Sequence, residues 1–243
     1  PQAVHFCDNH EIIGAPFFIM DRKLGVVIRT TLPENFNQMT NGPELISAQL
    51  INVLAEFHQV NYSALGLDDL GKPEGFLQRQ VKGWKNRWDK AKHEDLPAVE
   101  NIYNWLSENI PETKNYSIIH NDYKLDNVIF DADDPLRLIG VLDWEMSTVG
   151  DPLMDLGCTL GYWVQTDDPD WFREARTMPS DIKGAPKRAE IITRFQECTG
   201  LSVENFPFYF CFELHCILLY TILAFVLCMF ALDFTSYLSL IHI

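Results

Sequence analysis

Hydrophobic residues recur at helical spacing through most of the chain. Apolar side chains three or four positions apart form one face of an amphipathic helix. This spacing predicts a helix that begins near Pro43, a second over 77–88 and a third over 97–110. It returns after residue 152 and again over 186–199. We therefore expect helices to make up most of the fold.

Short β-type runs interrupt the helical pattern at two places. Near the start, strands are predicted over 3–7 and 16–21, with a turn around Gly14 between them and Gly25 ending the second. Farther along, apolar runs predict strands within YSIIH, NVIFD and LRLIGVLDWE. The first two of these runs frame what looks like a tight β-hairpin. The order of elements predicts an α+β fold with a mostly helical lobe and a small β-hairpin region.

An almost uninterrupted apolar run covers 216–232. It is marginal in length for a membrane span, which needs about 20 apolar residues. It is also apolar on all sides rather than along one face. Three interpretations stay open, namely a buried core helix, a membrane span and an anomalous end of the chain.

The charge balance bears on the kind of partner. The 243 residues include 34 acidic and 19 basic ones, which gives a formal net charge of −15. Because an acidic surface repels phosphate backbones, nucleic acid is not expected as a partner. A small anionic substrate is compatible with this charge if a metal ion or local Lys and Arg residues offset the field.

Cysteine usage indicates the compartment. The six cysteines show no paired CxxC spacing, and four of them lie in apolar runs. This pattern favours buried, reduced thiols in an intracellular protein, cytoplasmic or organellar, over disulfides or a zinc site. No basic, serine-rich leader precedes the first predicted strand. Because the chain begins at Pro1 in mid-strand, we expect it to be a fragment whose N-terminal part is missing.

The stretch SIIHNDYKLDNVIFD, residues 117–131, crowds polar residues between two apolar runs. Within it, His120, Asp122, Lys124 and Asn127 form the pattern H-x-D-x-K-x-x-N, and Asp143 ends an apolar run sixteen residues beyond Asn127. Phosphoryl transfer from ATP needs a carboxylate near the acceptor hydroxyl, oxygen ligands for Mg²⁺ and cations near the transferred group. The stretch contains all of these.

The roles follow from the side-chain chemistry. Asp122 is the candidate that accepts the proton of the acceptor hydroxyl, and Lys124 is the candidate contact to the γ-phosphate. Asn127 and Asp143 offer a neutral and an anionic oxygen to Mg²⁺, which takes few protein carboxylates besides phosphates. His120 is expected to support the loop by hydrogen bonding. Two further carboxylates are expected in solvated turns or caps, namely Asp126 and Asp131.

The series HNDYKLDN…LDWE…GDPLMDLG resembles the aminoglycoside phosphotransferase/choline kinase-like family, a branch of the protein-kinase-like fold. It is most similar to the kinase domains that are linked to acyl-CoA dehydrogenases. The resemblance implies ATP- and Mg²⁺-dependent transfer of a phosphoryl group to a hydroxyl of a small molecule. It also implies fusion to an acyl-CoA dehydrogenase domain in the full-length protein, for which a hydroxylated acyl substrate would be suitable by analogy.

Further residues are assigned through this resemblance. Asp155 resembles the buried aspartate that braces the family's catalytic loop. The backbone around Met20, Asp21 and Arg22 resembles the hinge that meets adenine. The family usually has glycine where Asn121 stands, but asparagine tolerates left-handed backbone angles better than most residues.

The resemblance also divides the chain. Residues 1–24 would be a remnant of the N-terminal lobe and hinge, 25–205 the C-terminal kinase-like lobe, and 206–243 an apolar segment outside that pattern. The phosphate-covering loop and the family's lysine–glutamate pair would lie before residue 1. The fragment itself is therefore expected to be inactive or weakly active.

Other interpretations compete with this one. They are a catalytically silent kinase-like binding module, a membrane-anchored fragment, and a metal-dependent hydrolase that uses His120 and Asp122. Asp151 either caps the following helix or assists near the metal. The histidines without partners at ligand spacing are expected to be structural, namely His58, His93 and His215. The tryptophans are mostly expected in the core, with one or two of them lining an acceptor pocket.

Overall fold

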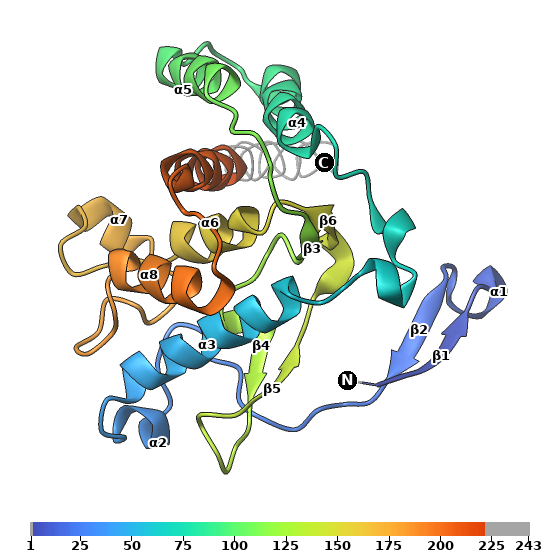
Figure 1. Cartoon of the computed structure of the whole chain (residues 1–243), viewed down its shortest axis with the longest axis vertical. Helices are drawn as coiled ribbons and strands as arrows, with labels where there is room; N and C mark the ends of the chain where they lie inside the picture. Colours follow the sequence, from blue (N-terminus) through green and yellow to red (C-terminus); the bar gives the residue numbers. More distant parts are fainter. Residues whose placement is uncertain (1, 222–243) are drawn as a thin grey trace, which may run out of the picture. The chain divides into compact units, whose positions relative to one another are not determined.

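The computed structural model describes residues 2–221 and divides the chain into two compact units (Figure 1). Unit 1 comprises Pro1–Glu56, Asp122–Glu145 and Tyr162–Cys198. Unit 2 comprises Phe57–Asn121, Met146–Gly161 and Thr199–Ile243. The division predicted from the family resemblance, with limits at residues 24 and 205, stays a prediction.

Unit 1 contains two small antiparallel sheets and most of the 17-residue helix α3 (Gly42–His58). Strands β1 (Ala3–Cys7) and β2 (Phe17–Met20) form one sheet, and β4 (Val128–Phe130) and β5 (Leu138–Val141) form the other. Its helices are α1 (His10–Ile13), α2 (Glu34–Asn37), α3 (Gly42–His58), the 3₁₀ turn η3 (Leu125–Asn127), α7 (Asp170–Glu174) and α8 (Arg188–Thr199). The last two residues of α3 belong to unit 2.

Unit 2 is mainly helical. Among its described residues, β3 (Ser117–Ile119) pairs with β6 (Thr148–Gly150) in antiparallel register. Its helices are the 3₁₀ turns η1 (Ser63–Leu65) and η2 (Asp68–Leu70), then α4 (Phe76–Ala91), α5 (Pro97–Glu108), α6 (Leu153–Gly161) and a helix over 206–221. The 3₁₀ turn η4 (Trp144–Met146) lies where the chain passes from unit 1 to unit 2.

Most predicted elements are present. The three long helices begin within a residue of their predicted starts, with proline in the first turns of α3 and α5. The first two strands are confirmed, and the short helix α1 fills the connection before the left-handed Gly14 (φ 86°). Strand β2 ends at Met20, earlier than the predicted end at Gly25.

Gly25 has a different role from ending a strand. A Cβ atom at this position would lie 2.4 Å from the carbonyl oxygen of Phe130. The next residue, Val26, exchanges two 2.8 Å backbone hydrogen bonds with Phe130. Only glycine allows this close approach of two backbones, so Gly25 permits the bridge that joins residue 26 to β4.

The predicted tight hairpin across 117–131 is wrong. Strand β3 pairs with β6 and β4 pairs with β5, so the two apolar runs belong to different sheets. Residues 120–127 between them form a loop that ends in the 3₁₀ turn η3. Hairpin connections are usually two to five residues long, and this longer polar loop lets each strand find another partner. The hairpin of this region is instead β4–β5.

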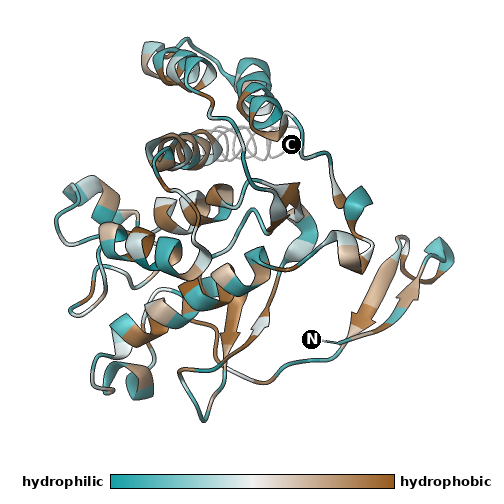
Figure 2. Ribbon diagram, viewed as in Figure 1, coloured by the Kyte–Doolittle hydropathy of each residue, from teal (hydrophilic) through white to brown (hydrophobic). Residues whose placement is uncertain are grey.

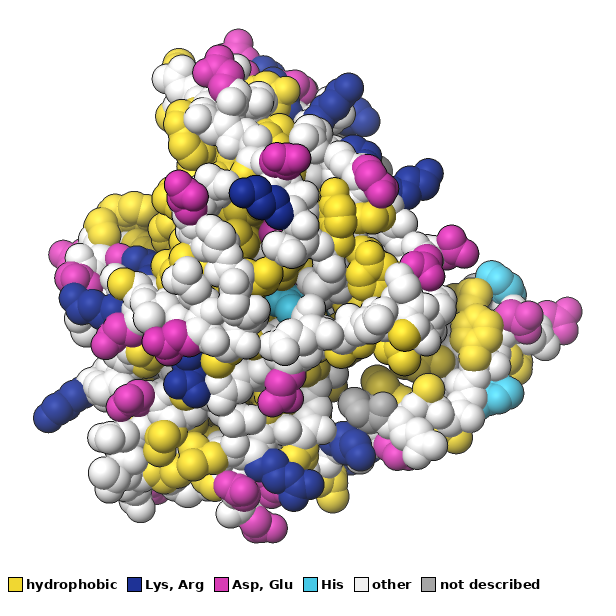
Figure 3. Space-filling view, in the orientation of Figure 1, with side chains coloured by type: hydrophobic (Ala, Val, Ile, Leu, Met, Phe, Trp, Pro, Cys, Tyr) yellow, Lys and Arg dark blue, Asp and Glu magenta, His cyan; other side chains and the backbone are white. Residues whose placement is uncertain are grey.

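Each unit has buried apolar side chains. In unit 1, the rings of Phe36 and Phe130 meet edge to face with centroids 6.0 Å apart, and both are fully buried. In unit 2, Trp88, Val99 and Leu219 form a buried cluster. Strand β4 is hydrophobic along its length in Figure 2, which agrees with its burial. Figure 3 shows hydrophobic side chains on the surface of β1–β2, where Phe6 and Phe18 are exposed.

The tryptophans are only partly buried in the core, contrary to most of the prediction. Trp88 and Trp163 are buried as predicted, but three tryptophans are exposed, namely Trp105, Trp144 and Trp171. The prediction failed for these because aromatic residues also occur on surfaces and in cavity walls.

No helix in residues 2–221 is long and apolar enough to cross a membrane. Residues 222–243, which include most of the predicted apolar run, lie outside the described residues.

Candidate active site

The loop before β4 brings Asp122, Lys124 and Asn127 together in unit 1. The Asn127 side-chain amide donates hydrogen bonds to the carbonyl oxygen and to Oδ2 of Asp122, both at 2.8 Å. The Lys124 ammonium contacts the same Oδ2 and lies 3.8 Å from Oδ1 of Asp126. It also lies 5.4 Å from the centroid of the Tyr162 ring. The Asp122 carboxylate is thus held by an amide and a cation.

Asp143 is placed near this loop by the β4–β5 hairpin. The N–H of Leu142 donates a 2.8 Å hydrogen bond to the backbone carbonyl of Asn127. Asp143 therefore comes directly after the residue that pairs with Asn127. Its backbone is left-handed, with φ of 65°, a conformation that aspartate and asparagine adopt more often than most residues.

A cavity of about 510 Å³ in unit 1 contains Asp143 in its wall. Met20 and Phe18 of β2 and the residues from Val141 to Glu145 also line it. The structure thus brings predicted residues Met20 and Asp143 to one cavity, whereas Asp21 and Arg22 are not part of its wall. Trp144 also lines this cavity, and the sequence pattern, which predicts most tryptophans in the core, did not single it out as a site residue. Its Nε1–H donates to the carbonyl of Val141 at 3.0 Å, which fixes the ring at the cavity.

The two predicted magnesium ligands fit a magnesium ion by their chemistry. Because the Asn127 amide nitrogen is used on Asp122, the remaining atom of that side chain is an oxygen, as a hard cation requires. Asp143 adds a carboxylate. Within residues 2–221, no three His, Cys, Asp or Glu side chains converge as a metal site. Two protein oxygens agree with the preference of Mg²⁺ for one or two carboxylates plus phosphate oxygens.

Asp155 of α6, in unit 2, binds the backbone that leads into Asp122. Its Oδ2 accepts a 2.8 Å hydrogen bond from the N–H of His120, and its Oδ1 accepts one of 2.7 Å from Asn121. Asn121 has φ of 63°, which confirms that asparagine supports a left-handed backbone where the family usually has glycine. His58 Nε2 lies 2.9 Å from Oδ2 of the same carboxylate, and the spacing of histidines in the sequence gave no signal for this contact.

Asp151 is a capping residue. Its Oδ1 accepts a 3.0 Å hydrogen bond from the N–H of Leu153 at the start of α6, and its Oδ2 accepts one of 2.7 Å from the Tyr209 hydroxyl. Burial raises the pKa of Asp151, and these two hydrogen bonds oppose that rise. Of the two interpretations of Asp151, the cap agrees with these contacts.

Comparison with known proteins defines the class. Residues 1–190 match the model of the phosphotransferase enzyme family. The chain belongs to this family, and its fold is the predicted protein-kinase-like α+β fold. The resemblance seen in the sequence motifs is confirmed.

Individual relatives narrow the branch. The chain is 30% identical over 220 residues to acyl-CoA dehydrogenase family member 11 of Homo sapiens, covering 86% of this chain and 26% of that protein. It is 32% identical to the Gallus gallus protein of the same name, with 86% and 27% covered. Member 10 of Mus musculus is 29% identical, with 88% and 20% covered. The chain thus spans about a quarter of the length of these curated relatives.

Solved structures agree with the family. A candidate aminoglycoside phosphotransferase from Ralstonia eutropha has a TM-score of 0.73 and 32% identity, covering 88% of this chain and 65% of that one. A choline/ethanolamine kinase family protein from Mesorhizobium loti has a TM-score of 0.55 at 14% identity, with 96% and 65% covered. The second likeness supports the fold alone.

Proposed function

We propose that this protein transfers the γ-phosphoryl group of ATP to a hydroxyl group of a small molecule, together with Mg²⁺. One observation carries the proposal, namely the grouping of Asp122, Asn127 and Asp143 in unit 1. Asn127 bonds Asp122 through its side chain and the residue before Asp143 through its backbone. Phosphoryl transfer requires a carboxylate base and metal ligands in such proximity.

Asp122 and Lys124 would act directly on the reacting groups. Asp122 would orient the acceptor hydroxyl and take its proton. Lys124 would bind an oxygen of the transferred phosphoryl group as a charge-assisted donor. Because its ammonium now contacts Asp122 and lies near Asp126, an incoming phosphate would compete with these carboxylates for it.

The nucleotide would use the 510 Å³ cavity of unit 1. Met20 would contact adenine from β2, with the backbone of Asp21 and Arg22 as further candidates. Asn127 and Asp143 would hold Mg²⁺, which would neutralise charge on the phosphates. A solved structure of the same fold is a GDP and kanamycin complex of an aminoglycoside phosphotransferase. We therefore include GTP as an alternative donor.

The acceptor would use a cavity of about 370 Å³ in unit 2. Asn121, the chain neighbour of Asp122, is in its wall, and Arg87 and Glu213 add charge there. The other wall residues are largely apolar or aromatic and include Phe76, Trp84, Met146, Met154 and Phe212. Such a lining suits an aliphatic chain. Together with the names of the curated relatives, it supports a hydroxylated acyl substrate and fusion to an acyl-CoA dehydrogenase domain.

A screen of the full-length protein tests the proposal. Nucleotide consumption is measured with ATP and with GTP against hydroxylated acyl compounds, aminoglycosides and choline, and the phosphorylated product is identified by mass spectrometry. We expect one class of hydroxyl compound to yield a phosphate monoester. Tight nucleotide binding without turnover on any acceptor class would instead favour the catalytically silent module.

A further inference from the structure

His58 belongs to a buried group of polar atoms in unit 2. The Asp155 side chain is fully buried, and the His58 side chain is only 1% exposed. Both oxygens of Asp155 accept backbone N–H groups, so we assign the His58 Nε2 that lies 2.9 Å from Oδ2 as a further donor to this carboxylate. His58 is the last residue of α3 and stands 97 positions before Asp155 in the sequence.

The other two donors to Asp155 are the consecutive backbone N–H groups of His120 and Asn121. Two successive N–H groups can converge on one anion when the backbone turns through a left-handed residue, and Asn121 takes that conformation with φ of 63°. A non-glycine residue in this region is strained and stays there only when its surroundings hold it. The orientation of the Asp155 carboxylate therefore determines the path of the backbone directly before Asp122.

The His58 contact reinforces that orientation. The two backbone N–H groups belong to the loop itself, whereas His58 binds the carboxylate from the end of α3 and so ties it to a second element. Oδ1 has the Asn121 N–H, whereas Oδ2 is shared by the His120 N–H and His58 Nε2. Removing the side-chain donor would leave a buried carboxylate short of one partner, which is strongly unfavourable in an apolar interior.

We propose that His58 is a positioning residue, which fixes the Asp155 carboxylate and through it the peptide from His120 to Asn121 that leads into Asp122. The effect on turnover rests on the proposed phosphotransfer function. The effect on the backbone does not. Two separate measurements therefore test the proposal.

The experiment uses the full-length protein and three substitutions of His58. Leucine fills the space without a donor. Glutamine carries its amide nitrogen at about the reach of Nε2, whereas asparagine reaches only as far as Nδ1. The matched control is His215→Leu, which removes another buried histidine of unit 2. His215 does not line the candidate acceptor cavity, and it is not a partner in the hydrogen bonds between Asp155 and the loop. Amide hydrogen exchange of peptides that cover 117–127 is followed by mass spectrometry, and kcat and KM for ATP are measured beside it.

We expect exchange at His120 and Asn121 to be about tenfold faster in His58→Leu and His58→Asn, and close to wild type in His58→Gln and in the control. We expect kcat to fall about 10- to 100-fold in the first two variants with KM for ATP nearly unchanged, because the base is misplaced while the nucleotide site is intact. Glutamine should restore most of kcat.

Two outcomes would overturn the inference. Wild-type exchange at 120–121 in every folded His58 variant would overturn it, as would equal acceleration in His58→Gln and His58→Leu. If His58→Leu does not fold, exchange in His58→Asn is compared with exchange in His58→Gln, and equal exchange in these two variants would overturn the inference. A wild-type protein without turnover, but with the predicted exchange pattern, would contradict the proposed function and leave the positioning role of His58 supported.

Discussion

At the residue scale, the side chain and the backbone of Asn127 have separate partners. The amide nitrogen donates to Asp122, and the carbonyl accepts the N–H of Leu142. One residue therefore connects the loop that contains the candidate base to the end of the strand that precedes Asp143. Because the nitrogen is already bound to Asp122, the side-chain oxygen is the atom of this amide that would bind Mg²⁺ in the proposed site.

Replacing Asp143 tests the magnesium role at this scale. We expect Asp143→Asn to weaken binding of ATP about 10- to 100-fold in the presence of Mg²⁺, because a neutral oxygen replaces the anionic ligand. Without the metal, wild type and variant should bind ATP equally. Isothermal titration calorimetry with and without EDTA measures both conditions. Asp133→Asn in the exposed β4–β5 turn is the control, and an Asp143→Asn affinity equal to that of this control would count against the role.

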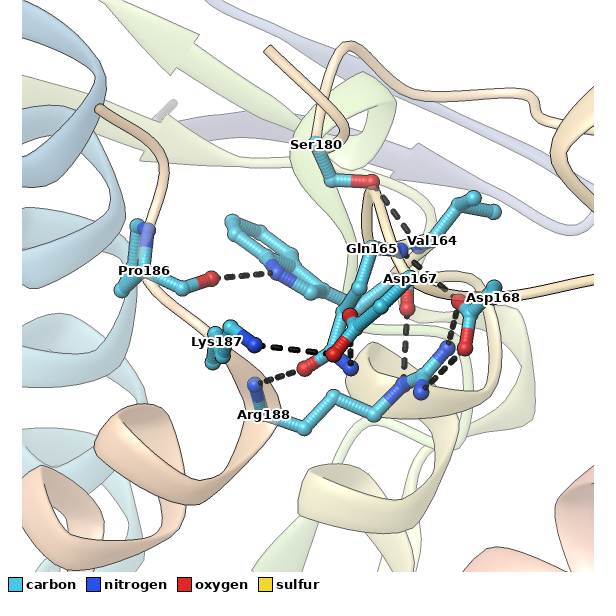
Figure 4. A network of polar contacts seen from close by, with 9 residues as sticks. Val164, Gln165, Asp167, Asp168, Ser180, Pro186, Lys187 and Arg188 are labelled. Carbon is cyan, nitrogen blue, oxygen red and sulfur yellow. Dashed lines mark hydrogen bonds and ion pairs between the residues drawn. The ribbon is translucent and has the colours of Figure 1, made fainter. Parts of the chain in front are cut away.

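At the element scale, Arg188 at the start of α8 holds the segment that follows α6 (Figure 4). Its guanidinium donates to the carbonyl of Trp163 at 2.8 Å and to both oxygens of Asp168. Its backbone N–H donates to the side chain of Gln165 at 2.6 Å. The Arg188 and Asp168 side chains are 16% and 12% exposed, so this bidentate pair is shielded from water far more than a surface ion pair.

Arg188→Lys should lower the free energy of unfolding by about 1–3 kcal/mol. Lysine keeps the charge, but its ammonium cannot reproduce the planar guanidinium, which donates to three acceptor oxygens at once. Chemical denaturation measures this change. The control is Arg137→Lys, since Arg137 is 68% exposed and lies 3.5 Å from Asp131. There the change should stay within about 0.5 kcal/mol. Equal effects at the two positions would mean that the Arg188 contacts add no stability.

His215, in the helix over 206–221, should make the free energy of unfolding depend on pH. Burial lowers the pKa of His215 below its usual value of 6.5. The unfolded chain therefore binds a proton more readily, and stability is lost as the pH falls below about 6.5. In His215→Leu, the fall in unfolding free energy between pH 7 and 5 should be shallower by up to about 1.4 kcal/mol per pH unit. Identical slopes would show that His215 protonates equally in both states.

At the scale of the whole molecule, local patterns predicted local structure. Periodic apolar residues predicted α3, α4 and α5 correctly, because the apolar face of an amphipathic helix is visible in the spacing of residues over a few helical turns. The loop residues Asp122, Lys124 and Asn127 were identified because their chemistry requires given residue types at short, fixed spacing. Family resemblance supplied Asp155.

Contacts between residues that lie far apart in the sequence could not be predicted in this way. A short apolar run shows that β3 is a strand but does not identify β6 as its partner, so the predicted hairpin was wrong. The His58–Asp155 contact joins positions 97 residues apart, and a single histidine at a helix end carries no local sign of it. Most tryptophans were predicted in the core, whereas Trp144 lines a cavity, because hydrophobicity does not distinguish a buried side chain from one in a cavity wall.

The central claim is that Asp122 is the base of a phosphotransferase, and turnover by Asp122→Asn tests it most directly. The full-length protein is assayed for ATP-dependent phosphorylation of the best acceptor from the screen, beside wild type and Asp131→Asn. Asp131 accepts the N–H groups of Asp133 and Asp134 in a turn, which makes it a nearby carboxylate without a proposed catalytic role. We predict that kcat of Asp122→Asn falls at least about 100-fold while Asp131→Asn stays near wild type. Equal turnover in wild type and Asp122→Asn would contradict the account.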